Sequence, residues 1–250
     1  MIDDNKVPEM VINWDQTGCQ LVSGGDWTLT AKGESQVTMT GLDDKRQMTL
    51  LLSVAMDGTL LPPQLIYAGK TERCLPEVNF PTEWNVTCTE NHWSTEASML
   101  EFAEKVLIPY VNQQRDGLPL SQCDQKAVAI FEVFAAHRGD ALLSLLKDNE
   151  IIPLFVPAAC TDKLQPLDLS FNREYKEQLK VQFHTWYARK VGQLLRDNEN
   201  AGEEGPVNVD MKKSTLKPVH ANWIVTTHAE MAERRDVIRL GFRMAGLIEK

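Results

Sequence analysis

Two apolar segments separated by an Asp-Gly turn constrain the fold of this chain more than any other feature. Residues 48–56 are a Leu-rich run, Asp57-Gly58 follows, and residues 60–67 return as a second apolar run. An Asp-Gly pair between two apolar runs favours a β-hairpin, because the tight turn needs positive φ angles that these residues tolerate. The chain therefore contains a β-sheet, and the other segments decide which class of sheet protein it forms.

Segments typical of strands and of helices alternate along the rest of the chain. The first predicted strand ends at Asp15, where Gln16-Thr17-Gly18 breaks the apolar run. The predicted strands are residues 10–15, 36–40, 48–56, 60–67, 126–131 and 151–156. Amphipathic periodicity predicts a helix that Ser94 opens and others over residues 140–148, about 168–195 and 220–247. The acidic, glycine-containing residues 197–206 predict a surface loop. This order predicts an α/β fold in which helices pack on a mixed sheet.

Composition limits the functions that the chain can have. The net charge of -9 argues against a general nucleic-acid binder, although an acidic protein can still carry a local basic face. No apolar run approaches the ~20 residues that span a bilayer, and the polar N-terminus is not a secretory signal. We therefore expect no membrane partner. The cysteines are odd in number, scattered and free of CxxC spacing, which predicts reduced thiols in an intracellular protein: Cys19, Cys74, Cys88, Cys123 and Cys160.

Three acids stand where predicted elements meet. Asp15 and Glu132 end two strands, and Asp168 begins the long helix. Carboxylates that converge in a low dielectric repel each other unless a cation neutralises them, and oxygen ligands suit Mg²⁺ or Mn²⁺. Two such ions can activate water and stabilise the leaving oxygen of a phosphodiester. A chain with 35 acids contains many such triples, so solvated or capping carboxylates remain the alternative on spacing alone.

The residues around these acids carry a family resemblance. The three contexts occur in order as Asn13-Trp14-Asp15-Gln16-Thr17-Gly18, as Phe131-Glu132-Val133-Phe134-Ala135-Ala136-His137, and as the run from Cys160 to Asn172 that contains Gln165-Pro166-Leu167-Asp168. Together they resemble the DDE superfamily endonuclease domain of pogo/Tigger-type transposases, to which centromere-protein-B-like and jerky-like proteins are related. The resemblance covers residues 11–187, and residues 238–247 are similar to the end segment of the family.

The resemblance implies a fold, a reaction and a site. The fold is RNase H-like, a mixed five-stranded sheet with helices on both faces. Residues 1–195 would form the catalytic domain, and residues 196–250 an acidic loop and a C-terminal helical segment of the same domain. In the reaction, water hydrolyses a phosphodiester at the transposon end and the freed 3′-hydroxyl attacks target DNA. Asp15 and Asp168 match the first and third catalytic acids, which with Glu132 would bind two Mg²⁺ or Mn²⁺ ions. The implied partner is DNA, the implied compartment is the nucleus, and a homodimer is compatible with this scheme.

Two departures from the family pattern bear on activity. The second acid of the family is Asp, whereas this chain has Glu132. The extra methylene moves the carboxylate by roughly 1 Å, and a misplacement of that size can cost ~10²-fold in rate. We therefore expect impaired or absent cleavage. The family also carries N-terminal helix-turn-helix modules, whereas the first predicted strand here begins at Met10. This predicts a fragment or a host-retained derivative.

Further residues have two interpretations each. His137 and Asn172 either support the metal site or make structural hydrogen bonds at helix ends. Four basic residues either contact nucleic-acid phosphates beside the acids or form a solvated helix face: Lys163, Arg173, Lys176 and Lys180.

The sequence thus leaves two principal hypotheses, a metal-dependent DDE endonuclease and a domesticated, inactive nucleic-acid-binding or protein-interaction module. A general RNase H-type ribonuclease fits less well, because the Gln-Pro-Leu-Asp context resembles transposases.

Overall fold

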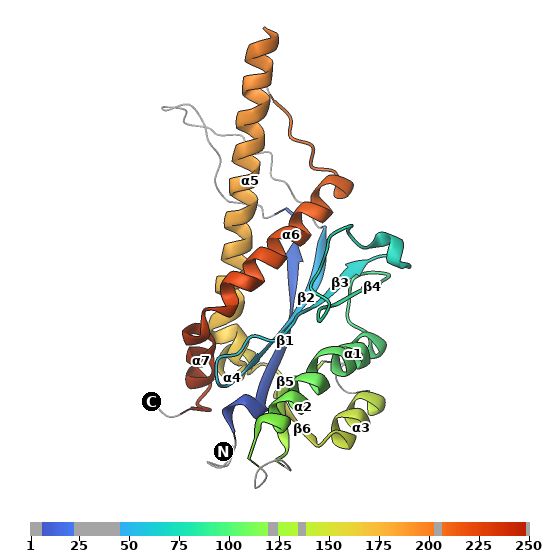
Figure 1. Cartoon of the computed structure of the whole chain (residues 1–250), viewed down its shortest axis with the longest axis vertical. Coiled ribbons are helices and arrows are strands. Elements are labelled where there is room, and N and C mark those ends of the chain that lie inside the picture. The colour runs from blue at the N-terminus through green and yellow to red at the C-terminus, as the bar shows by residue number, and fades with distance from the viewer. Residues whose placement is uncertain (1–6, 23–45, 120–124, 135–138, 203–206, 249–250) are drawn as a thin grey trace.

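A computed structural model describes residues 7–22, 46–119, 125–134, 139–202 and 207–248. These residues contain one sheet of six strands in the order β4-β3-β2-β1-β5-β6 (Figure 1). Its strands are β1 (Val11–Gln20), β2 (Gln47–Ala55), β3 (Gln64–Ala68), β4 (Asn85–Thr89), β5 (Ala127–Glu132) and β6 (Ile151–Val156). Single 3₁₀ turns precede β1 and follow β3, namely η1 (Pro8–Met10) and η2 (Glu72–Cys74).

Helices occupy most of the other described residues. They are α1 (Glu96–Phe102), α2 (Ile108–Gly117), α3 (Asp140–Asp148), α4 (Thr161–Leu164), α5 (Asn172–Ala201), α6 (Lys213–Ala232) and α7 (Arg235–Met244). Two π-helical turns join helices end to end, η3 (Ala103–Leu107) between α1 and α2, and η5 (Leu167–Phe171) before α5. Across the described ranges, none of the helices has the length and apolar character that crossing a membrane requires.

The strand directions define a mixed sheet. β1, β2 and β3 run antiparallel in sequence order, whereas β5 lies parallel to β1 and β6 lies parallel to β5. This arrangement confirms the predicted α/β, RNase H-like class, with one difference in strand number. β4 pairs parallel with β3 and adds a sixth strand to the expected five. Its sequence, Asn-Val-Thr-Cys-Thr, is too short and too polar to have signalled a strand. The strand predicted over residues 36–40 lies outside the described residues.

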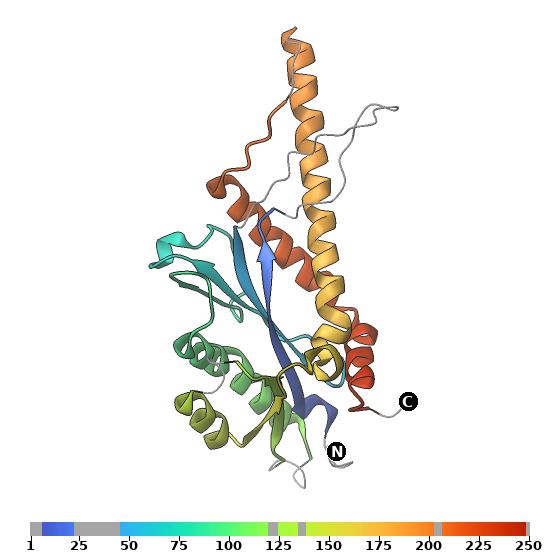
Figure 2. The ribbon, with the colours of Figure 1, turned by 180° about the vertical axis from the view of Figure 1, so that it is seen from behind.

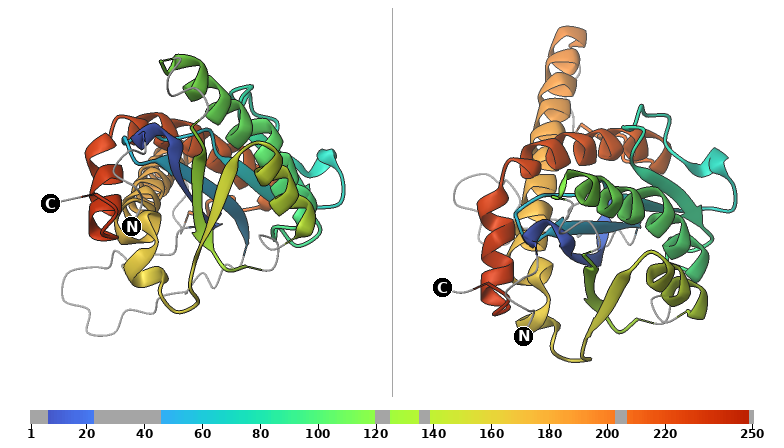
Figure 3. Two further views of the ribbon diagram at one scale, coloured as in Figure 1. Left: turned by 90° about the horizontal axis from the view of Figure 1, so that it is seen from below. Right: turned by 60° about the horizontal axis from the view of Figure 1, so that its bottom comes forward.

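Alternation along β1 divides the interior into two layers. The side chains of Val11 and Cys19 face a core built with η5, α5, α6 and α7. The side chains of Ile12 and Trp14 face the opposite core, built with α1, η3, α2 and α3. Helices therefore cover both faces of the sheet, as expected, and α5 extends beyond the sheet (Figures 2 and 3).

Two predicted element boundaries are wrong for physical reasons. β1 does not end at Asp15, because its antiparallel pairing with β2 continues from Ile12↔Ala55 to Gln20↔Gln47. Asp15 is therefore in mid-strand, and the Gln-Thr-Gly run after it belongs to the ladder. The acidic loop also begins late, since α5 runs to Ala201 and ends where Gly202 adopts a φ of 69°. Glycine adopts this left-handed conformation without the steric cost of a Cβ, which makes it a frequent helix terminator.

Other predicted elements are confirmed in type with shifted ends. The hairpin turn is present, with Val54 bridged to Leu60, but the regular second strand begins only at β3. The helix expected to open at Ser94 begins one residue after Thr95, whose side chain forms a reciprocal capping box with Ser98. The C-terminal helical segment is longer than predicted and divides into α6 and α7.

Candidate active site

The three predicted acids approach one another from three elements. Asp15 is near the middle of β1, and Glu132 is the last residue of β5. The parallel register Asn13↔Ile130, continued by two residues, places Asp15 level with Glu132 on the sheet face that α5 covers. Asp168 lies in η5, in the π-helical turn that leads into α5. The adjacent strands and the following helix thus bring the acids to one region, as the sequence predicted.

Asn172 joins two of these acids directly. Its Nδ2 donates to Asp15 Oδ2 at 2.6 Å and to Asp168 Oδ1 at 2.9 Å. Asn172 follows Asp168 by one helical turn, which places both side chains on the same face. Both Asn172 and Asp15 are only 5% exposed. Of the two interpretations that the sequence left open for Asn172, the structure supports a place in the acidic site.

Asn13 fixes the backbone around the acids and was missed by sequence reasoning. The side chain is fully buried, and its Nδ2 donates to the main-chain oxygen of Ile130 at 2.9 Å. Its Oδ1 accepts from the main-chain nitrogen of Leu167 at 3.0 Å. One amide therefore ties β1 both to β5 and to the turn that bears Asp168. The available signal was an amide between the apolar residues Ile12 and Trp14, because a buried polar side chain needs partners.

Gln165 makes a second tie to the same turn. It is fully buried and donates from Nε2 to the main-chain oxygen of Trp14 at 2.9 Å, next to Asp15. Its main-chain oxygen accepts from the main-chain nitrogen of Asp168 at 3.1 Å. The glutamine of the Gln-Pro-Leu-Asp motif therefore positions the third acid against the first.

Helix α7 supports the Asp168 turn from outside. Ser170 donates from Oγ to the main-chain oxygen of Val237 at 2.9 Å. Gly241 lies so close to the turn that a Cβ there would overlap the Pro166 main-chain oxygen and the Ser170 Oγ. A glycine is thus required for this contact, which explains the Leu-Gly-Phe sequence in the closing segment of the chain.

Burial and repulsion from neighbouring carboxylates disfavour the charged forms of Asp15 and Glu132. Burial, followed by the charges of Asp168 and Glu132, raises the pKa of Asp15 to about 8, while hydrogen bonds from Asn172 and the main chain of Gln16 act in the opposite direction. Burial and then the charge of Asp168 also raise the pKa of Glu132. A nearby cation offsets this repulsion between like charges and so favours the ionised carboxylates.

The carboxylates of Asp15, Glu132 and Asp168 are chemically suited to a hard divalent cation, but they do not form a complete metal-binding site. Mg²⁺ and Mn²⁺ prefer oxygen ligands such as carboxylates. Carboxylates that repel one another are stabilised when such a cation binds between them. Within the described ranges, however, no three His, Cys, Asp or Glu side chains are close enough together to hold an ion. The structure brings Asp15 and Asp168 together through Asn172, and Glu132 lies within their electrostatic range.

The predicted basic residues divide between two places. Lys176 and Lys180 line a cavity of about 350 Å³ between α5 and the end of β1, with Gly18 and Gln20 on the strand side. Lys163 on α4 and Arg173 at the start of α5 are exposed and do not line this cavity. His137 lies outside the described residues.

Comparison with known proteins identifies the family to which this combination of fold and acids belongs. The family model for the DDE superfamily endonuclease matches residues 45–215, which is more than half of the chain. The chain therefore belongs to the DDE superfamily endonucleases. Asp15 precedes the matched range, so its assignment rests on the geometry described above.

Relatives of this chain include pogo-type proteins that are much longer than it. The mouse (Mus musculus) protein Pogo transposable element with KRAB domain is 25% identical over 175 residues, 70% of this chain and 27% of its own length. The human (Homo sapiens) Pogo transposable element with ZNF domain is 25% identical over 150 residues, 60% of this chain and 10% of its own length. The chain thus spans about a quarter or less of these relatives. Together with the family match, they confirm the predicted pogo-type DDE domain.

Solved transposase structures are also similar to the chain. The mariner Mos1 paired-end complex with Mg has a TM-score of 0.49 and 12% identity, covering 94% of this chain and 52% of the other.

Proposed function

We propose that this transposase-derived DDE domain cleaves DNA phosphodiester bonds with the help of divalent cations and transfers the freed strand end. The bridge from Asn172 to Asp15 and Asp168 carries the proposal, because it holds the buried Asp15 carboxylate beside the exposed Asp168, whose charge adds to burial in raising the pKa of Asp15. Such an arrangement is unfavourable for stability alone. Strongly perturbed acids beside a specific charge partner are typical of functional sites.

In this proposal the chain's own residues perform three tasks. Asp15, Glu132 and Asp168 hold two Mg²⁺ or Mn²⁺ ions through their carboxylate oxygens. When bound, the ions lower the pKa of an attacking water and stabilise the leaving oxygen. Asn172 fixes the Asp15 and Asp168 carboxylates relative to each other. Its Oδ1 has no hydrogen-bond partner among the described residues, so it can accept a hydrogen bond from a water in the site.

The basic residues are proposed to contact the DNA backbone. Lys176 lies one helical turn beyond Asn172, so α5 leads from the acids toward the cavity that Lys176 and Lys180 line. Lys163 and Arg173 would contact phosphates nearer the acids. Substitution of Lys176 and Lys180 by Gln should weaken DNA binding and lower its salt dependence by about one counterion per lost contact. Lys105→Gln is the matched control, because it removes an η3 lysine that pairs with Glu101.

Location and assembly belong to the same proposal. A DNA substrate makes the nucleus the expected compartment, which imaging of the full-length protein tests. Strand transfer that joins two DNA ends is compatible with a homodimer. Light scattering with and without DNA measures the oligomeric state of the chain.

Plasmid nicking by the purified chain with Mn²⁺ or Mg²⁺ tests the reaction. Nicking that Asp15→Asn abolishes and that exposed Asp148→Asn preserves would support a live metal site that tolerates Glu132. Nicking that appears only in Glu132→Asp would show an endonuclease fold silenced at one position. Unchanged nicking in Asp15→Asn would contradict the assignment.

A second candidate is a domesticated module that binds DNA or protein without turnover. The observations that favour it are Glu132 itself and the incomplete gathering of the acids around an ion within the described ranges. Salt-dependent DNA binding without nicking in the parent or in Glu132→Asp would support this candidate.

A further inference from the structure

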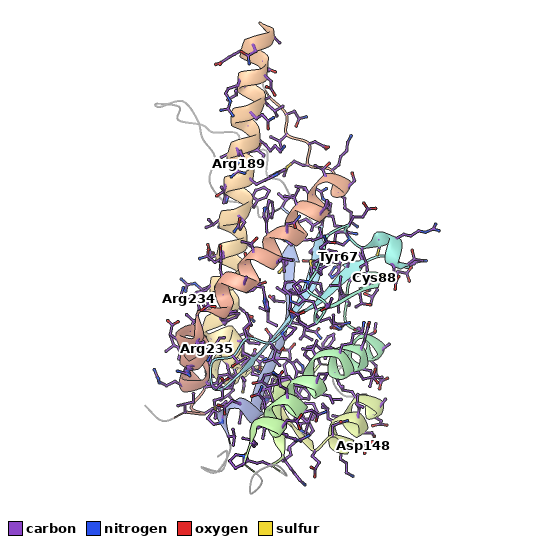
Figure 4. The ribbon with its side chains drawn as sticks, viewed as in Figure 1. Tyr67, Cys88, Asp148, Arg189, Arg234 and Arg235 are labelled. Carbon is purple, nitrogen blue, oxygen red and sulfur yellow. The ribbon has the colours of Figure 1, made fainter. Side chains whose placement is uncertain are left out.

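Two cysteines and a lysine meet near the outer edge of the sheet, away from the acids. Cys74 ends η2, Cys88 lies on the edge strand β4, and Lys217 extends from α6. Figure 4 shows Cys88 next to Tyr67 at this end of the sheet. None of these residues belongs to the site proposed for DNA cleavage.

Sheet geometry places both thiols on the same face. Cys88 is the parallel ladder partner of Tyr67, and the side chain of Tyr67 faces the core under α6. Gly69 is two residues further along the chain, so its missing side chain would point to that face as well. Cys74 fills this space, since a Cβ on Gly69 would overlap the Cβ and Sγ of Cys74. The glycine thus lets η2 fold back until Cys74 lies beside the strand end that carries Cys88, close enough for the two thiols to influence each other's charge.

Lys217 provides a positive charge beside the two thiols. Its ammonium donates to the main-chain oxygen of Cys74 and lies 5.2 Å from the centre of the Tyr67 ring. Burial, the neighbouring Cys74 and the charge of Glu72 together raise the pKa of Cys88, and Lys217 opposes this rise. A cation near a thiol favours the thiolate, which is the reactive form of cysteine.

We propose that Cys74 and Cys88 are a redox-active dithiol that closes reversibly into a disulfide when it meets a low-molecular-weight disulfide such as oxidised glutathione. One thiolate attacks a sulfur of the glutathione disulfide, forms a mixed disulfide and releases one glutathione thiolate. The second thiolate then attacks the protein sulfur of the mixed disulfide, which forms the Cys74–Cys88 bond and releases the second glutathione thiolate. Two protein thiols are oxidised and one glutathione disulfide is reduced to two thiols, with two protons passing to solvent and the released thiolates.

The other described cysteines lack this arrangement. Cys19 is buried beneath α5, and burial raises its pKa to about 12. Cys160 precedes α4 near the opposite end of the sheet order. A disulfide between Cys74 and Cys88 would instead tie η2 to β4 across residues 74–88, and so would fasten the outermost strand to the turn that precedes it.

The test is oxidation of the purified full chain with excess oxidised glutathione under native conditions. We expect the loss of two titratable thiols, an intact mass lower by two hydrogen atoms, and a Cys74–Cys88 crosslinked peptide that dithiothreitol removes. The melting temperature should rise by roughly 5–10 °C on bridging, because the crosslink restricts the unfolded chain.

Variants separate this pair from general thiol oxidation. Cys74→Ser should leave a stable glutathione adduct on Cys88, whereas Cys160→Ser should form the internal bridge at the rate of the parent. Lys217→Met should slow formation of the Cys74–Cys88 disulfide several-fold but leave the final fraction of disulfide unchanged. Retention of both thiols in the parent, or accumulation of a glutathione adduct there without the crosslinked peptide, would overturn the proposal.

Discussion

Replacing Asp15 by Asn should stabilise the protein at neutral and alkaline pH in the absence of divalent cations. In the folded chain the pKa of Asp15 is about 8, against an ordinary value of 3.8 that unfolding restores. Between these values the native state holds a proton that the unfolded state has released, so the free energy of unfolding falls as pH rises. At about 1.36 kcal/mol per pKa unit, a gap of about 4 units gives a ceiling of ~6 kcal/mol at pH 8. Water entry and relaxation reduce the effect to about 2–3 kcal/mol.

Urea unfolding in EDTA from pH 4 to pH 8.5 measures this effect. The amide that Asp15→Asn introduces can still accept the hydrogen bond from Asn172, so the variant should match the parent near pH 4 and exceed it progressively toward pH 8. Asp148→Asn is the control, because this acid is exposed at the end of α3 (Figure 4), and α3 packs on the sheet face opposite the one that carries Asp15. A constant difference in the free energy of unfolding across the whole pH range would refute the reasoning, since it would show that ionisation of Asp15 does not destabilise the folded chain.

Four further outcomes are expected. Mn²⁺ should raise the melting temperature of the parent at pH 8 but not that of Asp15→Asn, as differential scanning fluorimetry would show. Gly241→Ala should destabilise the chain by about 1–3 kcal/mol in urea and abolish nicking, because its methyl group overlaps the turn that leads into η5. The control for this variant is Gly192→Ala, which has only a flexible arginine end nearby and should be neutral or stabilising. Asn13→Ala should cost about 2–4 kcal/mol in the same urea assay by loss of two buried hydrogen bonds. Burial lowers the pKa of His228 to about 4, so its contribution to stability is complete above pH 6.5 and is lost toward pH 4; His228→Gln should flatten this part of the urea-unfolding profile.

The sequence predicted the parts of the site that follow from local pattern. Asp15, Glu132 and Asp168 were singled out by their places near predicted element ends together with the family resemblance of the residues around them, and the register of β1 and β5 places the first two level. Sequence pattern did not reveal that β1 continues past Asp15, because that depends on pairing with β2, which lies beyond a segment of more than twenty residues.

The residues that position the acids were harder to recognise. Gln165 was part of the quoted motif, but its partner is a main-chain oxygen 151 residues earlier in the chain. The requirement for Gly241 arises from the close approach of α7 to η5, and no local preference encodes that distance. β4 was missed because its pairing with β3 comes from the path of the intervening loop, while its own residues are mainly polar.

The two hydrogen bonds of Asn13 have a consequence for how the chain folds. They join residue 13 to residues that follow it by 117 and 154 positions, so the first bond requires β5 and the second requires the turn that leads into α5. Contacts of such long sequence separation slow folding, because their loop-closure entropy must be overcome first. During synthesis, Asn13 would leave the ribosome long before Leu167 and would remain without this partner until the second half of the chain arrives. The acidic site is therefore expected to assemble late, and a chain that stops before η5 would keep a nearly complete sheet without a pre-organised centre.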